Sequence, residues 1–329
     1  MMKSVNQEST FSIQEIWAAR ERLQPFIHRT PLIHSNSISQ LTGSEVYLKM
    51  ECWQKCGCFK VRGAINKVSS LCAVEREMGL VSASSGNHAI GVAYASHLFG
   101  NPPTKIFMPE STDQTRIHKV ETWGSEVILA GEFYQDAYDA AQAHITALGG
   151  TYIHSHADRE VMAGQGTIGL EILEDLPNVD AVIIPIGGGG MASGIGTALK
   201  AGSNAIRIIG VEPAAAPAAY RSLKEGVCCE HITPLPSLAD GLLGGVGKLT
   251  YEVFKHFVEQ VVLVSEPEII SAMRHFQAHE QLIIEAASSI GLSALLQNKL
   301  DLKGKKVVLL ITSRNIDADR YNRILKEGK

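Results

Sequence analysis

Short apolar segments rich in β-branched residues alternate with helical segments along most of the chain, and this alternation restricts the fold more than any other feature. Strand-like runs include EVYLKME (45–51), TKIFMPE (104–110), DAVIIPI (180–186) and KKVVLLITS (305–313). Strands that alternate with helices predict parallel sheets covered by helices. A chain of 329 residues has room for two such units. We therefore predict an α/β fold with two open, twisted, mostly parallel sheets in two domains, and a ligand site in the cleft between them.

The composition excludes several classes of protein. A formal net charge of −4 gives no large basic field for nucleic acid. No apolar run approaches the roughly 20 residues that cross a bilayer, and residues 1–16 lack the apolar core of a signal peptide. Six cysteines in a chain of this length do not indicate a disulfide framework. We therefore expect a cytoplasmic protein with reduced thiols that binds neither nucleic acid nor membrane.

A run of four glycines separates a predicted strand from a predicted helix: Gly187, Gly188, Gly189 and Gly190. Backbone N–H groups at such a turn, together with the helix dipole, form an anion site, and glycine lets a phosphate approach closely. The same glycines with Ala192, and Glu212 at the end of the next strand, also fit a nicotinamide-dependent dehydrogenase. That alternative leaves the segments FKVRGA (59–64) and SSGNHA (84–89) without a function.

A lysine, Lys60, follows the first of these strand-like runs in the segment KCGCFKVRGA (55–64). A single phosphate at the glycine loop indicates a small phosphorylated cofactor, and the cofactor that pairs with a lysine is pyridoxal phosphate. Its aldehyde forms a Schiff base with the amine, and burial favours the neutral amine that this reaction needs. The segment SSGNHA opens a predicted helix, where hydroxyl and free N–H groups suit a substrate carboxylate.

These segments together resemble the threonine/serine dehydratase and serine racemase family, which belongs to fold type II of the pyridoxal-phosphate enzymes and has a tryptophan synthase beta-like fold. CFKVRGA is similar to the family motif S-F-K-x-R-G-A, SSGNHA to its asparagine loop, and PIGGGGMASGIG to its phosphate loop. Further matches follow in family order over nearly the whole chain: AGQGTIGLEI (163–172), GVEP (210–213), ADG (239–241) and IEAASSIGLSALL (284–296). Each match is weak alone, and their order makes the set specific.

The resemblance implies a role for each matching residue. Lys60 holds the cofactor and then acts as the general base, Phe59 packs against the cofactor ring, and the glycine loop binds the phosphate. Asn87 contacts the ring hydroxyl, and Thr312 places a hydroxyl opposite the pyridine nitrogen. Ser85 is also the proton donor on the opposite ring face in racemases. The residues implied to bind the substrate are Ser84, Ser85, Asn87 and His88, although His88 also fits a purely structural position in its helix.

The chain departs from the family pattern beside these residues. Cys56 and Cys58 stand where Thr and Ser are usual, and a thiol does not hydrogen-bond as a hydroxyl does. Ser313 and Arg314 replace two glycines after Thr312, and the stretch ASSIG (287–291) replaces a glycine-containing one. The residues that we name as further candidates for contacts with substrate or cofactor are Cys58, Asp240, Gly241, Glu285 and Arg314.

A divalent-cation site is an open question at the sequence level. Glu212 matches an acidic ligand of the family's cation site, and Ala216 offers its carbonyl. The expected second acid is replaced by Ala218. A hard cation requires several oxygen ligands, so we do not predict this metal firmly.

We therefore predict a dehydratase, or ammonia-lyase, that converts a small L-β-hydroxy amino acid such as threonine or serine to a 2-oxo acid and ammonia. An amino-acid racemase of the serine racemase type is the nearest alternative, and a dehydrogenase or a non-enzymatic carrier of pyridoxal phosphate is less favoured. We expect a homodimer. The large, cofactor-binding domain is predicted over residues 1–74 and 158–329, and the small domain with the asparagine loop over residues 75–157.

Overall fold

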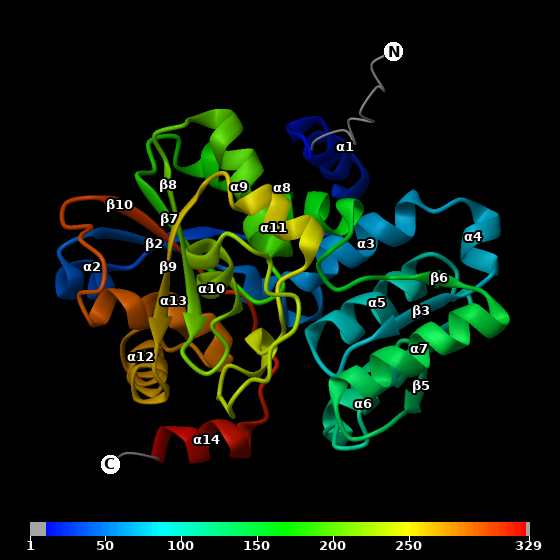
Figure 1. The fold of residues 1–329 in the computed structure, drawn as a ribbon. Coiled ribbons are helices and arrows are strands. Elements are labelled where there is room, and N and C mark those ends of the chain that lie inside the picture. The colour runs from blue at the N-terminus through cyan, green and yellow to red at the C-terminus, as the bar shows by residue number, and fades with distance from the viewer. Residues whose placement is uncertain (1–10, 327–329) are drawn as a thin grey trace.

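The computed structural model describes residues 11–326, which form two separate sheets with helices around them (Figure 1). The large sheet has the strand order β1-β2-β10-β7-β8-β9, and only β1 is antiparallel to its neighbour. Its strands are β1 (Leu32–His34), β2 (Glu45–Lys49), β7 (Ala181–Pro185), β8 (Arg207–Pro213), β9 (Val258–Val264) and β10 (Lys306–Leu310). The first two strands therefore join a sheet whose other members come from the second half of the chain.

Alternate residues of the large sheet's strands supply two hydrophobic cores, because successive side chains of a strand point to opposite faces. One face packs against α2, α12, α13 and α14, and the other against α8, α9, α10 and α11. These helices are α2 (Asn36–Thr42), α8 (Arg159–Asp175), α9 (Gly190–Gly202), α10 (Ala218–Glu225), α11 (Lys248–Phe254), α12 (Glu266–His279), α13 (Ala286–Leu296) and α14 (Ala318–Lys326). Helix α1 (Ile13–Leu23) packs on α8.

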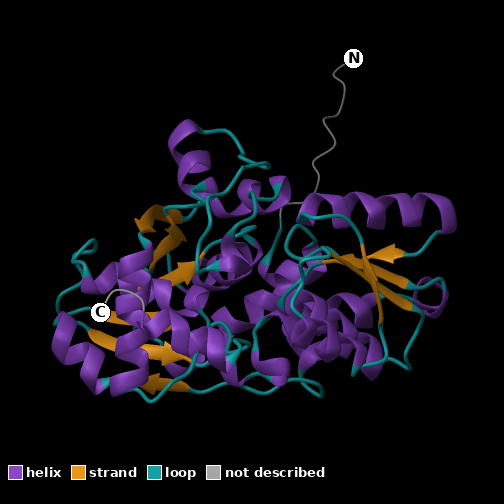
Figure 2. Ribbon diagram, turned by 90° about the horizontal axis from the view of Figure 1, so that it is seen from below, coloured by secondary structure: helices purple, strands orange, loops and turns teal. Residues whose placement is uncertain are grey.

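The small sheet is parallel throughout, in the order β5-β4-β3-β6. Its strands are β3 (Leu80–Ala83), β4 (Thr104–Met108), β5 (Glu126–Leu129) and β6 (Thr151–Tyr152). One face packs against α3, α5 and α6, and the other against α7. The helices of this region are α3 (Lys60–Ser70), α4 (Ala73–Glu77), α5 (Asn87–Leu98), α6 (Gln114–Glu121) and α7 (Tyr134–Leu148). Figure 2 shows the strands in two groups with helices between them.

The predicted fold class is confirmed: both sheets are mostly parallel and covered by helices. The small sheet lies within the predicted range 75–157, while the domain boundaries themselves stay a prediction. The helical segment after Phe59 is divided into α3 and α4. Leu71 has extended backbone, and Cys72 begins α4 with its N–H donating to the Glu75 carboxylate at 2.7 Å. None of the helices within residues 11–326 is long and apolar enough to cross a membrane.

Glycines let three helices approach closely and so fix the distance between the segments that carry the site. A Cβ added at Gly164 of α8 would lie 2.6 Å from the Arg62 carbonyl oxygen in α3. A Cβ added at Gly194 of α9 would lie 2.1 Å from the Met162 carbonyl oxygen in α8. Since α3 begins at Lys60 and α9 begins at Gly190, α8 acts as a spacer between the lysine and the glycine loop.

Candidate active site

Lys60 is the first residue of α3, and its amine lies in a confined, weakly charged environment. The Nζ atom donates a hydrogen bond to the Ser155 carbonyl oxygen at 2.8 Å and lies 5.3 Å from the centre of the Phe59 ring. No carboxylate within residues 11–326 forms an ion pair with it. Burial lowers the pKa of Lys60 to about 8, because a buried cation loses its hydration. The amine therefore gives up its proton more readily than an exposed lysine does, which favours the neutral form that a nucleophile or base requires.

The end of β10 lies directly beside this lysine. The Phe59 N–H donates to the Thr312 carbonyl oxygen at 3.1 Å, and Cys58 forms an isolated bridge with Ser313. The Thr312 hydroxyl is buried and lies 2.8 Å from the hydroxyl of Ser288 in α13. The segments that carry Lys60 and Thr312, which are 252 positions apart in sequence, are thus paired in the fold.

The asparagine loop joins the small sheet to the same site. It follows β3, and α5 begins at Asn87. The Asn87 amide donates to Glu285 at 2.9 Å and accepts from the Asn315 amide at 2.7 Å, and the Cys58 thiol donates to the Asn87 carbonyl oxygen at 3.8 Å. Burial raises the pKa of Glu285. The sequence did not single out Asn315, although it directly follows Ser313 and Arg314, the two residues that depart from the family pattern.

The glycine loop connects β7 to α9. Gly189 has φ +88°, a conformation that favours glycine. The Gly188 carbonyl oxygen accepts from the Thr250 hydroxyl at 2.6 Å and from the Gly247 N–H at 3.2 Å, which holds the loop in place. The N–H groups at the start of α9 have no partner within the helix and carry its positive dipole end. This arrangement suits an anion such as a phosphate.

A segment that sequence analysis missed, His154 to His156, lies between the lysine and the glycine loop. The Ser155 carbonyl oxygen accepts from Lys60, and the His156 ring packs on Gly188 so closely that a Cβ there would lie 2.2 Å from ring atom Cγ. Burial, together with the nearby Lys60 cation, lowers the pKa of His154 to about 4 and that of His156 well below 6.5. Both rings are therefore neutral at pH 7, and no pattern in the sequence places them at this site.

His88 lies in α5, with ring atom Nε2 donating to the Ile153 carbonyl oxygen at 2.9 Å. Burial lowers the pKa of His88 to about 3. Its other nitrogen, Nδ1, is buried and has no hydrogen-bond partner among residues 11–326. The bond to Ile153 accounts for a structural role of His88, and a contact with substrate stays a prediction.

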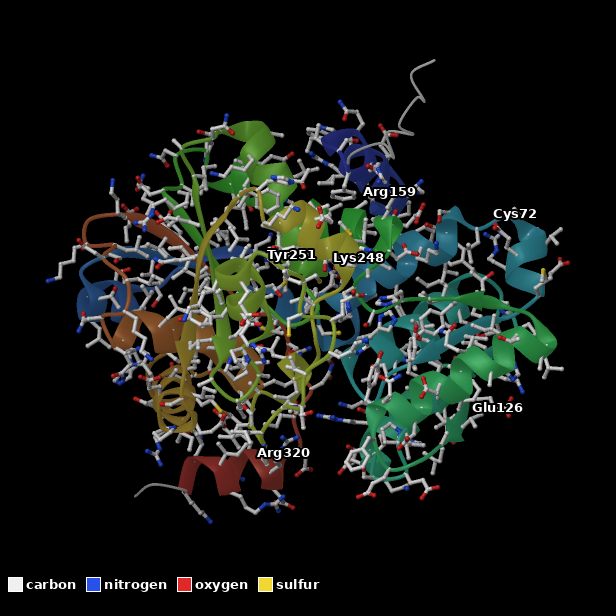
Figure 3. The ribbon with its side chains drawn as sticks, in the orientation of Figure 1. Cys72, Glu126, Arg159, Lys248, Tyr251 and Arg320 are labelled. Carbon is white, nitrogen blue, oxygen red and sulfur yellow. The ribbon has the colours of Figure 1, made fainter. Side chains whose placement is uncertain are left out.

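A cavity of about 520 Å³ opens beside Ser85 and is lined by residues from both sheets' domains. Asp240 accepts from Arg116 of α6 at 3.0 Å and from Arg320 of α14 at 2.8 Å. Arg116 also donates to the Ser85 carbonyl oxygen at 3.4 Å. Arg320 is labelled at the lower edge of Figure 3, on the helix that ends the described chain. Asp240 thus links α6 to α14 at this cavity.

The remaining candidates divide into two groups. Glu285 and Cys58 are buried at the site, as described above. Arg314 is exposed and packs over Gly57, with its N–H donating to the Gly57 carbonyl oxygen at 3.0 Å. The Gly241 carbonyl oxygen faces Gly187, 3.5 Å from the position of an added Cβ. Arg314 and Gly241 are therefore exposed, whereas Glu285 and Cys58 are buried.

Glu212 and Ala216, the residues suggested as ligands of a divalent cation, are not arranged to bind one. Glu212 is fully buried, and its two oxygens accept from the N–H groups of Ala219 and Tyr220 at 2.7 and 2.8 Å. The Ala216 carbonyl oxygen accepts from the Ala218 N–H at 3.0 Å. No group of three or more His, Cys, Asp or Glu side chains within residues 11–326 is arranged to hold a metal. The same hydrogen bonds leave Glu212 without a free oxygen for the ribose that a dehydrogenase would bind.

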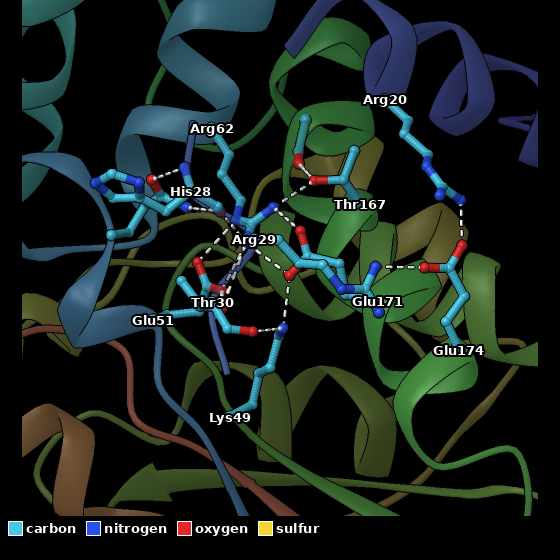
Figure 4. A network of polar contacts seen from close by, with 12 residues as sticks. Arg20, His28, Arg29, Thr30, Lys49, Glu51, Arg62, Thr167, Glu171 and Glu174 are labelled. Carbon is cyan, nitrogen blue, oxygen red and sulfur yellow. Dashed lines mark hydrogen bonds and ion pairs between the residues drawn. The ribbon is translucent and has the colours of Figure 1, made fainter. Parts of the chain in front are cut away.

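A buried network of charges behind the site was also missed from the sequence (Figure 4). Arg62, two residues after Lys60, donates to Glu51 at 2.8 Å and to Glu171 at 2.7 Å, and Lys49 donates to Glu171 at 2.5 Å. The side chains of Lys49, Glu51 and Arg62 are fully buried. Two cations and two anions balance in charge, and the network ties α3 to both β2 and α8.

Comparison with known proteins shows to which family the chain belongs. The model of the family described as pyridoxal-phosphate dependent enzyme matches residues 23–313. The chain belongs to this family. It is 42% identical over 318 residues to L-threonine ammonia-lyase of Thermotoga maritima, which covers 96% of this chain and 79% of the relative. It is 40% identical over 322 residues to catabolic L-threonine dehydratase of Staphylococcus aureus, with 96% and 92% covered.

The structure of maize serine racemase is similar to the whole fold, with a TM-score of 0.89 and 32% identity over 96% of this chain and 97% of that one. The resemblance seen in the sequence is therefore confirmed at the level of the family and its cofactor. The residues present also fit pyridoxal phosphate: Lys60 supplies a buried amine without a carboxylate partner, the start of α9 supplies N–H donors, and Thr312 supplies a hydroxyl.

Proposed function

We propose that this chain is an ammonia-lyase that converts a small L-β-hydroxy amino acid, such as L-threonine or L-serine, to a 2-oxo acid and ammonia. The observation that carries this proposal is the amine of Lys60, held by the Ser155 carbonyl with a pKa lowered to about 8. The relatives named L-threonine ammonia-lyase and L-threonine dehydratase, at 42% and 40% identity over nearly the whole chain, support the substrate class.

Residues of the chain itself account for binding and proton transfer. The N-terminus of α5, with Ser84 and Ser85 before it, offers N–H and hydroxyl donors to the substrate carboxylate. Lys60 Nζ takes the proton from the substrate Cα as general base. Pyridoxal phosphate, when bound, supplies the sink for the electron pair left at Cα. Loss of the β-hydroxyl as water gives an enamine, and its hydrolysis by water releases the 2-oxo acid and ammonia.

The test is Lys60→Ala, assayed for 2-oxo acid and ammonia from L-threonine and L-serine. We expect activity to fall by a factor of about 10² to 10⁴ or more, since the general base is removed, and the visible absorption band of the bound cofactor to be lost. Lys55→Ala, five residues earlier, is the control that keeps both. An unchanged band in Lys60→Ala, or no release of ammonia by the unaltered protein from any β-hydroxy amino acid, contradicts the proposal.

Racemisation is the second candidate, because it needs a proton donor on the face opposite Lys60. Ser85 lines the 520 Å³ cavity, and the similar fold of maize serine racemase supports this alternative. Ser85→Ala separates the two activities: we expect it to abolish formation of the D-isomer from L-serine while elimination continues. If the unaltered protein forms D-serine faster than pyruvate, racemisation is the main activity.

The cellular compartment and the oligomeric state are also part of the proposal. All six cysteines are free thiols in the structure, which supports a reducing compartment such as the cytoplasm. Trp17 and Trp53 are 47% and 41% exposed, and such exposed aromatic residues support an interface in a homodimer. The net charge of −4 gives no support to binding of nucleic acid. Light scattering of the holoenzyme tests the dimer directly.

A further inference from the structure

The backbone around His154 holds its ring in one tautomer. Ring atom Nδ1 accepts hydrogen bonds from the N–H groups of His156 and Ala157 at 3.1 and 2.9 Å. A ring nitrogen that accepts hydrogen bonds carries no proton, and a neutral imidazole has its single proton on the other nitrogen. His154 is therefore fixed as the tautomer with the proton on Nε2, and that atom is a hydrogen-bond donor.

This donor is available to a ligand. Nε2 of His154 has no hydrogen-bond partner among residues 11–326 and, unlike Nδ1 of His88, it is not a buried atom. The half-buried ring lies edge-on between the rings of Tyr152, at 5.9 Å, and His156, at 4.5 Å. The next residue, Ser155, accepts from the Lys60 amine at 2.8 Å. A neutral donor held on both sides thus lies in the same segment that holds the lysine.

The position of this segment indicates which acceptor the donor meets. The start of α5 suits the substrate carboxylate, and the start of α9 suits the cofactor phosphate. The segment connects these two helix starts, because His88 of α5 donates to the Ile153 carbonyl oxygen at 2.9 Å and the His156 ring packs on Gly188. The β-hydroxyl is the substrate oxygen that neither helix start accounts for.

We propose that His154 is a catalytic residue whose Nε2–H donates a hydrogen bond to the β-hydroxyl oxygen of the substrate and stabilises the negative charge that develops on it as the Cβ–O bond breaks. The inference rests on the proposed function, in which this hydroxyl is the leaving group. A donor aimed at an oxygen that gains charge in the transition state accelerates the step in which that charge appears.

His154 gives up no proton in this step. The Cα–H and Cβ–O bonds break, the electron pair of the first becomes the double bond between Cα and Cβ, and the pair of the second leaves with the oxygen. Lys60 Nζ receives the Cα proton, and that proton, directly or through solvent, completes the departing water molecule. Nδ1 of His154 is occupied by two N–H groups, so the ring cannot take up one proton while it releases another.

Two replacements separate the donor at Nε2 from the acceptor at Nδ1. His154→Asn places an amide oxygen as far along the side chain as Nδ1, so it keeps the acceptor for the two N–H groups and loses the more distant donor. His154→Gln places an amide N–H₂ as far along the side chain as Nε2, so it keeps that donor. A purely structural role of His154 would be preserved better by asparagine, and the proposed role better by glutamine.

The experiment compares L-serine with β-chloro-L-alanine in the holoenzyme, because chloride leaves without help from a hydrogen-bond donor. In His154→Asn we expect kcat for L-serine to fall by about 10², the effect of one lost donor to a developing oxygen anion. Its KM for L-serine and its kcat for β-chloro-L-alanine should change by less than about threefold, since the lost contact acts in the transition state of one leaving group. His154→Gln should bring kcat for L-serine to within about tenfold of the unaltered enzyme.

Spectra of the holoenzyme labelled with ¹⁵N in its histidines supply a readout that does not depend on turnover. We expect His154 to show the neutral Nε2–H tautomer, without titration, between about pH 6 and 9. The inference is overturned if His154→Asn slows both substrates equally, if His154→Gln is no faster with L-serine than His154→Asn, or if the proton of His154 is on Nδ1. Failure of the unaltered holoenzyme to release ammonia from any β-hydroxy amino acid would instead overturn the proposed function, so the two failures are distinguishable.

Discussion

Replacing Lys60 by methionine is expected to stabilise the apoprotein, although it removes the group on which the proposed chemistry depends. The folded protein lowers the pKa of Lys60 from 10.5 to about 8, a difference of about 2.5. At about 1.36 kcal/mol for each pKa unit, keeping this cation in the folded state costs about 3 kcal/mol below pH 8. Methionine loses the hydrogen bond to Ser155, worth about 1 kcal/mol. The expected net gain in unfolding free energy at pH 7 is about 2 kcal/mol.

The dependence on pH makes this prediction specific. Between about pH 8 and 10.5 the unfolded chain binds more protons at Lys60 than the folded chain, so the stability of the unaltered apoprotein rises with pH in this window. The advantage of Lys60→Met is therefore full below pH 8 and disappears by about pH 10.5.

The assay is chemical denaturation of the apoproteins at a series of pH values, with Lys67→Met as the control. Lys67 lies in the same helix, but Asp158 at 2.8 Å and Glu160 at 3.4 Å raise its pKa. Its charge therefore stabilises the fold below the unfolded pKa, and its replacement should destabilise by about 1 kcal/mol at pH 7. A Lys60→Met apoprotein that is less stable than the unaltered one at pH 7, or whose stability difference does not change between pH 7 and 10, refutes the reasoning.

Two further predictions concern the framework around the site. Gly194→Ala places a Cβ 2.1 Å from a backbone oxygen of α8, so it should lower the free energy of unfolding by at least about 1–3 kcal/mol and weaken cofactor binding. Gly244→Ala, which has open space around it, is the control and should change neither quantity. Equal midpoints of denaturation for the two variants would contradict the spacer role of α8. Arg62→Met leaves Glu51 and Glu171 without their shared partner and should lower the free energy of unfolding by about 3–5 kcal/mol at pH 7. A loss below about 1 kcal/mol in denaturant unfolding would contradict the role of Arg62 as the shared partner of these buried carboxylates.

The parts of the site that could be predicted from the sequence are those whose chemistry depends on local geometry. A glycine run between a strand and a helix forms an anion site through its local geometry alone, so the role of Gly187–Gly190 could be predicted from the sequence. Lys60 could be identified as a site residue because a lysine that directly follows a buried strand calls for a functional explanation. The pairing of β2 with β10 could not be predicted, since the register between strands whose paired residues are 261 positions apart leaves no local signal.

The parts that could not be predicted depend on contacts between distant segments. His154 and His156 form an ordinary polar stretch in the sequence, and only the folded chain brings them between Lys60 and Gly188. Charged residues such as Glu51 and Arg62 are usually solvated, so their burial as partners had no signal in composition or periodicity. The glycines have a comparable explanation, because Gly164 and Gly194 are required only once α3, α8 and α9 are in contact.

Cys58, two residues before Lys60, stands where the family motif has a serine, and its surroundings show what a thiol does at this position. Burial raises the pKa of the Cys58 thiol well above its usual range, so the group is neutral and is not a nucleophile at pH 7. Its contact with the Asn87 carbonyl oxygen, at 3.8 Å, is that of a weak donor. A serine at this position would place a stronger donor beside the same backbone carbonyl oxygen, whereas Glu285 and Asn315 bond the side-chain amide of Asn87. Cys58 therefore provides apolar volume, and the orientation of the Asn87 side chain is set by Glu285 and Asn315.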